Sequence, residues 1–280
     1  MICGPNLLGK SPDAEQLDAS EARNLIASME SSGWRYSLDK HGDLKLLSLD
    51  KPVDFMEIFS GCGHLTLAAA QNGLRVSPSI DKQLGIGHAD SFKIDIRIAS
   101  DRRIVWALVV LLSPIWIHMG FPCTFWVAIA HWTRTRDLDR NEKARLEALV
   151  FIVFTRQLVY HQASRRRHSS IENPLHSVSW DLDIVKDMVD KGSMEFVQTD
   201  LCAWGAADPE SGNFYHKAMR FASTFNMKPL ARTCPKNHEH EPVQGKVREG
   251  PLKGRRRSAI SGQYPLSLCQ AWTSLAKSYL

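Results

Sequence analysis

The 280-residue sequence has no apolar run long enough to cross a membrane and no cysteine spacing typical of a disulfide framework. Its longest apolar stretch, Ile104–Leu112, is interrupted by Ser113 and Pro114, whereas a bilayer span needs about 20 apolar residues. The N-terminus lacks the basic-then-apolar order of a secretory signal. The six cysteines are scattered, which suits a reducing compartment. We therefore expect an intracellular protein, nuclear or cytoplasmic, that is neither secreted nor in a membrane.

The composition is that of an ordinary globular protein, with 44% apolar and 23% charged residues. The length allows one large α/β domain, or a core with small appendages. The net charge of +5 is modest, but basic residues cluster at Arg165–His168 and Arg255–Arg257. Such clusters can neutralise nucleic-acid phosphates, and they are equally common as solvated loops.

Residues 1–52 are expected to form an N-terminal extension to the core. Asp18 is a plausible N-cap for a helix over 19–31, with Glu21 three positions on. Two alternating segments, 34–38 and 44–46, flank a turn and predict a β-hairpin.

From residue 53 to about 200, apolar strand-like segments alternate with helical ones, which predicts a doubly wound, mostly parallel sheet. The expected strands are 55–59, 92–96, 115–119, 169–172 and 194–199. The expected helices are 64–72, 102–112, 139–163 and 181–190.

Two glycines, Gly61 and Gly63, stand directly between a predicted strand and a predicted helix. This arrangement lets the backbone approach a ligand at the helix N-terminus. A third glycine in the pattern GxGxxG is absent, which disfavours a nicotinamide-dependent oxidoreductase.

Two further segments carry chemically useful side chains, Cys123 within Gly120–Thr124 and Glu172 within Ile171–Pro174. A cysteine at the rim of a sheet can act as a nucleophile when its pKa is lowered. A carboxyl group can hold a base or exchange a proton with it. Each feature alone more often has only a structural role, since free cysteines are commonly buried as small apolar side chains.

In this order and spacing, the three segments resemble the DNA (cytosine-5) methyltransferases. The resemblance implies a class I methyltransferase (Rossmann-like) fold and S-adenosylmethionine as cofactor, with a catalytic core over 53–200. It implies Cys123 as the nucleophile that adds to cytosine C6 and Glu172 as the acid that grips the base. The implied cofactor-binding residues are Phe59, Ser60, Gly61, Gly63, Leu65, Asp81, Asp95, Ile96 and Gly120. The implied substrate-binding residues are Pro122, Asn173, Arg165, Arg166, Lys217 and Arg220.

The chain also departs from the family pattern. His64, Thr124 and Pro174 stand where the family usually has other residues, and Gln198–Cys202 lacks the arginines that usually fix the extruded base. The segment 201–257 is short for a target-recognition domain. These departures leave three alternatives to a self-sufficient DNA enzyme: an RNA cytosine-5 methyltransferase, a partner subunit that supplies recognition, or an inactive binding or regulatory module. DNA is the favoured partner.

The segment 201–257 contains a group of potential metal ligands, Cys234, His238 and His240, which Cys202 could complete to a tetrahedral set. A structural zinc ion is therefore possible, although solvent-exposed histidines in a polar loop are the commoner arrangement. Residues 258–280 are expected to form a helix that returns to the core and loosely resembles the family helix closing the cofactor pocket.

Overall fold

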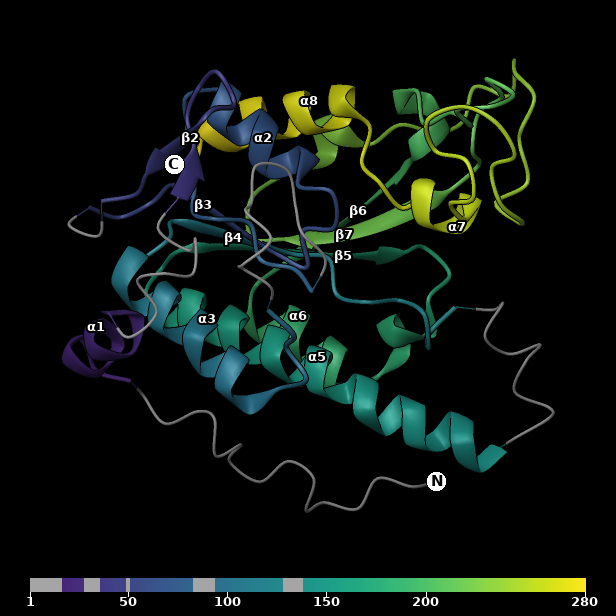
Figure 1. The fold of residues 1–280 in the computed structure, drawn as a ribbon. Coiled ribbons are helices and arrows are strands. Elements are labelled where there is room, and N and C mark those ends of the chain that lie inside the picture. The colour runs from purple at the N-terminus through teal and green to yellow at the C-terminus, as the bar shows by residue number, and fades with distance from the viewer. Residues whose placement is uncertain (1–16, 28–35, 49–50, 83–93, 128–137) are drawn as a thin grey trace.

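The computed structural model describes residues 17–27, 36–48, 51–82, 94–127 and 138–280. Figure 1 shows one central sheet with helices on both of its faces. Among the residues that the structure describes, no helix combines the length and apolar character needed to cross a bilayer. The five cysteines in these ranges are free thiols.

The sheet has five strands in the order β3-β4-β5-β7-β6. Their bounds are β3 Phe55–Ile58, β4 Trp116–Met119, β5 His168–Pro174, β6 Glu195–Asp200 and β7 Ala218–Ser223. The first three pair in parallel, and β7 is antiparallel to both of its neighbours. Every residue of β3 and β4 is buried, as expected for strands covered on both faces.

Helices α2 (His64–Gln71) and α8 (Leu266–Lys277) cover one face of the sheet, and α3 (Ala99–Leu112), α5 (Leu138–Ser164) and α6 (Asp183–Lys191) cover the other (Figure 1). Two apolar cores result, one on each face. The prediction of an α/β sheet sandwiched between helices is confirmed.

The N-terminal helix and hairpin are also present. Helix α1 spans Ala19–Ala27 and packs on α3, and the expected residues 28–31 lie outside the described ranges. Asp18 Oδ1 accepts hydrogen bonds from the backbone N–H groups of Ser20 and Glu21, which confirms it as the N-cap. Strands β1 (Tyr36–Leu38) and β2 (Leu44–Leu46) pair in antiparallel fashion.

The strand predicted over 92–96 is wrong for its described residues, 94–96, which form a loop and a turn. The backbone N–H of Asp95 is bound by the Asp101 carboxylate at 2.7 Å, and the Arg102 guanidinium donates to the Ile96 carbonyl at 2.8 Å. These side chains from the start of α3 take the hydrogen bonds that a sheet would use.

Strand β7 was not predicted. It lies in the segment 201–257, which we expected to be a recognition or metal-binding region, and it joins the core sheet between β5 and β6. The sheet is therefore mixed, and this segment is not separate from the core.

Candidate functional site

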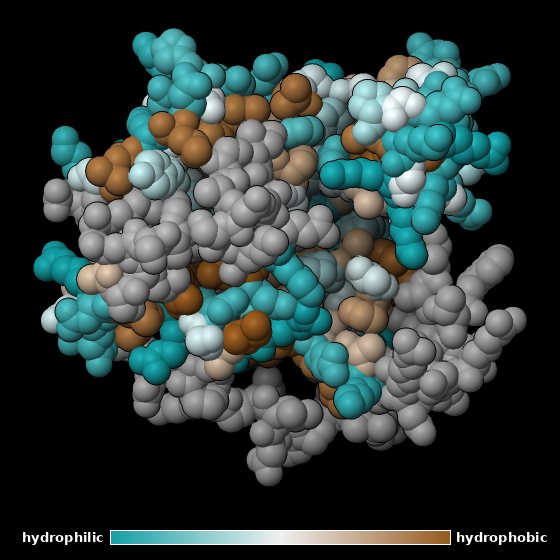
Figure 2. Space-filling model, viewed as in Figure 1, coloured by the Kyte–Doolittle hydropathy of each residue, from teal (hydrophilic) through white to brown (hydrophobic). Residues whose placement is uncertain are grey.

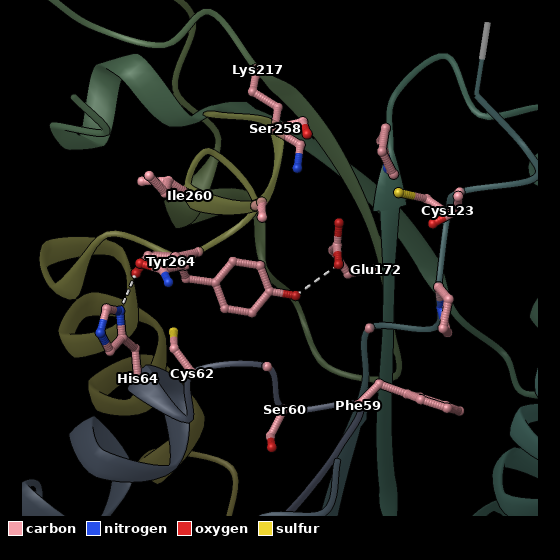
Figure 3. A pocket seen from close by; sticks show the side chains of 18 of the residues that line it. Phe59, Ser60, Cys62, His64, Cys123, Glu172, Lys217, Ser258, Ile260 and Tyr264 are labelled. Atoms are coloured by element: carbon pink, nitrogen blue, oxygen red, sulfur yellow. Dashed lines mark hydrogen bonds between the residues drawn. The ribbon is translucent and has the colours of Figure 1, made fainter. Parts of the chain in front are cut away.

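A cavity of about 550 Å³ opens where β3, β4 and β5 end. This is the edge at which parallel α/β sheets hold ligands, and the size falls in the range of small-molecule sites. We call it the central cavity. Of the residues predicted for function, it is lined by Phe59, Ser60, Gly61, Gly120, Pro122, Cys123, Glu172 and Lys217. The three sequence segments thus meet in one place (Figure 3).

The loop after β3 turns sharply through left-handed backbone conformations. Phe59, Gly61 and Gly63 have φ angles of 62°, 55° and 72°. A phenylalanine in this region is strained, and such strain is found mainly where function requires it. The Asp81 carboxylate accepts a hydrogen bond from Gly61 N at 2.9 Å, and the Phe59 ring meets Phe151 edge-on with centroids 5.7 Å apart.

Two polar side chains near this loop are buried. The hydroxyl of Ser60 has no hydrogen-bond partner in the described part of the chain, which is the condition of a group that a ligand completes. Burial raises the pKa of Glu57 to about 7, against hydrogen bonds from the Thr66 hydroxyl and backbone N–H that act to lower it. Glu57 therefore anchors the first turn of α2 from inside the sheet.

Cys123 lies in the loop after β4, and its Sγ atom points into the central cavity (Figure 3). Burial raises the pKa of the Cys123 thiol, the Lys217 ammonium opposes this rise, and the Glu172 carboxyl adds to it. The expectation of a lowered pKa is therefore wrong for this arrangement, because desolvation outweighs the single nearby cation. Lys217 is the group that favours the thiolate.

Glu172, in β5, is 8% exposed and faces the same space. Burial raises its pKa, while Lys217 and the Tyr264 hydroxyl act to lower it. Tyr264 Oη donates to Glu172 Oε2 at 2.8 Å. A buried carboxyl with a raised pKa can keep its proton near neutral pH and donate it.

Tyr264 is the end of a buried chain of hydrogen bonds, and its one hydroxyl proton goes to Glu172, so His118 Nε2–H is the donor to Tyr264 Oη. Trp116 Nε1 can only donate, and it does so to Ser170 Oγ at 2.8 Å. The Ser170 hydroxyl then donates to His118 Nδ1 at 2.9 Å, and His118 Nε2–H donates to Tyr264 Oη at 3.1 Å. Burial lowers the pKa of His118 to about 3, so a neutral ring with this tautomer is consistent with the chain.

Gly120 fits closely beside this pair. A Cβ atom at this position would lie 3.0 Å from Glu172 Oε2 and 3.1 Å from Tyr264 Oη. A side chain here would push against the carboxyl group, so the absence of one is part of the site.

Several predicted cofactor residues do not line the central cavity. Gly63 is the left-handed residue that precedes α2, while Leu65 and Ile96 are buried in the apolar cores. Asp81 contacts the cavity wall through Gly61. Asp95 lines a second hollow of about 460 Å³, and Arg97 and Lys82 hold its pKa well below the usual range.

Asn173 was predicted to bind substrate, but it is 1% exposed and does not line the cavity. Its amide donates to the Phe121 carbonyl at 2.9 Å. Asn173 therefore fixes the loop that carries Cys123 to the end of β5.

The three arginines predicted to bind substrate do not line the central cavity. Arg165 and Arg166 lie in the turn before β5, at the opposite edge of the sheet from the cavity. A strand rises about 3.3 Å per residue, so the seven residues of β5 separate them from the cavity by roughly 20 Å. Arg220 stacks over Trp180 and Phe196, with its Cζ atom 5.8 and 5.4 Å from the two ring centroids. Only Lys217 of the four predicted cations reaches the cavity.

Other cavity residues were not predicted, chiefly Tyr264, Arg255, Cys62, Ser258, Ile260 and Gly262. All of these except Cys62, which lies in the loop between β3 and α2, come from the segment before α8, where we expected only a loose return to the core. A single tyrosine in a loop carries no motif, so spacing could not have identified Tyr264. Arg257, by contrast, is held in ion pairs with Asp208, Glu210 and Glu241, which removes it from the basic cluster.

The predicted metal ligands come together. One ligand atom from each of Cys202, Cys234, His238 and His240 lies within 4.8 Å of the others. The grouping of these four side chains, drawn from two parts of the chain, is confirmed.

The central cavity combines a thiol beside a cation, a buried carboxyl with a raised pKa and a glycine-rich loop at a helix N-terminus. This set can add a nucleophile to an electrophilic ring, exchange a proton with that ring and hold a second ligand alongside it. No known protein-family model matches the chain, and no curated protein sequence matches it.

Proposed function

We propose that the protein transfers a methyl group from S-adenosylmethionine to C5 of cytosine in DNA, through a covalent adduct on Cys123. The observation that carries this proposal is the meeting of Cys123, Glu172 and the Phe59–Gly61 loop in one cavity. On this proposal the α/β sheet belongs to the class I methyltransferase fold.

The residues around the loop fit the cofactor. Ser60 offers a buried hydroxyl without a partner among the described residues, and Phe59 offers an aromatic face at the cavity wall. The Asp81 and Asp95 segments meet, since Ile94 N donates to the Asp81 carbonyl at 3.2 Å. Carboxylates at this edge of a sheet commonly bind ribose hydroxyls. When bound, S-adenosylmethionine would supply an electrophilic sulfonium methyl group.

Two thiols line the cavity, and burial raises the pKa of both, but only Cys123 has a cation among the groups that act on its pKa, so we assign it as the nucleophile. Burial raises the pKa of Cys62, and the carboxylates of Glu57 and Asp81 raise it further. Cys123 has the Lys217 ammonium nearby, which favours its thiolate. Entry of a base between these groups would bring the thiol and ammonium into a drier environment, where their attraction is stronger.

The chemistry needs a nucleophile and an acid on the same ring. After the Cys123 thiol loses its proton to solvent, its sulfur forms a bond to C6 as the C5=C6 double bond opens, and Glu172 gives its proton to N3. C5 is then nucleophilic and would take the methyl group as the bond from that group to the sulfonium sulfur breaks, which leaves S-adenosylhomocysteine as the second product. Loss of the C5 proton to solvent restores the double bond and expels the thiolate, and N3 returns its proton to Glu172.

Tyr264 fixes the orientation of Glu172 in this scheme. It donates to Oε2, so Oε1 is the oxygen left to carry the proton toward the base. A carboxyl group held on one oxygen by a buried donor is preorganised for transfer from the other.

Nucleic acid is the proposed partner because two cations, Lys217 and Arg255, line the cavity, and Lys217 stands across it from the Phe59–Gly61 loop (Figure 3). A target base must leave its stack to reach Cys123. The small number of cations fits either a partner subunit that supplies recognition or an RNA substrate read by shape.

The test measures transfer of tritiated methyl groups from S-adenosylmethionine to separate DNA and RNA pools. The Cys123→Ala variant runs in parallel. Oligonucleotides that contain 5-fluorocytosine should form an adduct that resists denaturation, because fluorine at C5 blocks the final elimination. Peptide mapping of the adduct decides between Cys123 and Cys62.

Label in 5-methylcytosine of DNA, with the adduct on Cys123, supports the proposal. Label confined to RNA changes the substrate and keeps the mechanism. An adduct on Cys62, or turnover by the Cys123→Ala variant, refutes the assigned nucleophile. Cofactor binding by calorimetry without adduct or label indicates a binding module.

A further inference from the structure

The side chains of Cys202, Cys234, His238 and His240 form a cluster, and none of them lines the central cavity. Cys234 Sγ lies 3.6 Å from His238 Nε2 and 3.5 Å from His240 Nε2. The two Nε2 atoms lie 3.0 Å apart. Both histidines therefore present the same ring nitrogen to one point.

The three spacings among Cys234, His238 and His240 match edges of a tetrahedral zinc site. With zinc–sulfur bonds of about 2.3 Å and zinc–nitrogen bonds of about 2.0 Å, a tetrahedron separates sulfur from nitrogen by about 3.5 Å and two nitrogens by about 3.3 Å. The two sulfur–nitrogen distances agree closely, and the nitrogen–nitrogen distance is slightly short.

The surrounding groups orient the ligands as a metal site requires. His238 Nδ1 lies 3.2 Å from Asn237 Oδ1, so donation from Nδ1–H leaves the Nε2 lone pair free for a cation. The backbone N–H of Lys236 points at Cys234 Sγ at 3.4 Å, which stabilises a thiolate. The backbone N–H of Cys234 is bound by the Asp200 carboxylate at 2.7 Å.

The segment that carries the cluster has little apolar core of its own. Its separate cluster of buried apolar residues consists of Tyr215, Val247 and Ile260. Hydrophilic side chains dominate its surface at the upper right of Figure 2. Small regions of this kind usually need a metal or disulfides to hold one conformation.

We propose that Cys202, Cys234, His238 and His240 bind one structural zinc ion. The ion clamps the loop around Cys234 to the short 3-10 helix η4 (Leu201–Trp204), directly after β6. Leu201 N donates to the Lys217 carbonyl at 2.9 Å. The proposed metal site therefore lies close to the residue before β7, Lys217, whose side chain lines the central cavity. This inference is independent of the methyl-transfer proposal and stands or falls on metal binding alone.

The first measurement is the metal content of the full-length protein, purified without chelators, by inductively coupled plasma mass spectrometry. We expect one zinc per chain. Cys234→Ser and His240→Asn should each lower zinc retention at least tenfold during dialysis. His216→Gln is the matched control, because its ring lies 4.8 Å from that of His240 without belonging to the cluster. This variant should keep its zinc.

A second readout keeps the proposal testable if the ligand variants fail to fold. Cobalt loaded into the wild type should give the intense visible absorption of a tetrahedral thiolate site. A strong chelator should speed tryptic cleavage at Lys236, between the ligands, and zinc should reverse it. Wild-type protein that neither contains nor retains zinc or cobalt overturns the proposal. Equal zinc loss in the His216→Gln control overturns the assigned ligand set.

Discussion

Replacing Tyr264 with phenylalanine removes one hydroxyl that serves two buried partners. It donates to Glu172 Oε2 at 2.8 Å and lies 3.1 Å from His118 Nε2. Glu172 borders the cavity and is 8% exposed, so water can replace its lost donor. His118 is 1% exposed and would keep an unpaired N–H group.

The expected cost follows from this difference. A buried polar group left without a partner costs about 1–3 kcal/mol, so Tyr264→Phe should lower the free energy of unfolding by about that amount. At an m-value of about 3 kcal/mol/M in urea, this corresponds to a fall in the midpoint of roughly 0.3–1 M. The same hydroxyl acts to lower the pKa of Glu172, so its removal raises that pKa further.

Two assays check the two effects separately. Urea unfolding followed by tryptophan fluorescence measures the stability loss. The pH dependence of adduct formation with 5-fluorocytosine DNA measures the Glu172 proton, and its alkaline limb should move to higher pH in the variant. Tyr279→Phe is the control, because Tyr279 is 42% exposed. Unchanged stability would refute the hydrogen-bond chain, and an unmoved alkaline limb would refute Glu172 as the acid.

Three other substitutions test the site. Gly120→Ala should lower methyl transfer roughly tenfold to a hundredfold, since its Cβ would lie 3.0 Å from Glu172 Oε2 and displace the carboxyl. Lys217→Gln should raise the pH at which iodoacetamide alkylates Cys123, because the opposing ammonium is lost. Glu57→Gln should gain stability relative to the wild type as pH rises from 4.5 to 7, by about 3 kcal/mol. In that window the unfolded wild-type carboxyl ionises while the folded one still holds its proton.

The Lys217→Gln prediction has a matched control, and the other two predictions have outcomes that contradict them. Arg220 stacks on aromatic rings outside the cavity, so the Arg220→Gln variant should leave the alkylation profile of Cys123 unchanged. A Gly120→Ala enzyme with full activity would show that the close fit to Glu172 has no role. A stability difference for Glu57→Gln that does not vary with pH would show that this carboxyl is not the buried acid described.

The sequence predicted the parts of the site that carry local signals. Cys123 and the loop at Gly61 follow apolar strands, Glu172 lies near the end of another, and the ends of parallel strands meet at one edge of a sheet. The Cys234–His240 cluster was visible for a similar reason, because three of its members lie within seven residues.

The parts that escaped prediction depend on long-range packing. Strand β7 reads Ala-Met-Arg-Phe-Ala-Ser, a segment with Arg220 at its centre and no strong alternation. Its place is set by pairing with β5 and β6 on both sides. Tyr264 reaches Glu172 across 92 residues of chain, a contact that no local pattern encodes.

The reversed direction of β7 has a consequence for how recognition can change. Asp200, the last residue of β6, pairs with Ala218, the first of β7, so the intervening connection leaves and re-enters the sheet at the same edge. That edge is the mouth of the central cavity, where Lys217 stands. Under the proposed function, residues added to or removed from this connection would change the surface that a substrate meets, without altering the β6–β7 pairs themselves. Substrate specificity could therefore change while the strand pairing of the sheet stays the same.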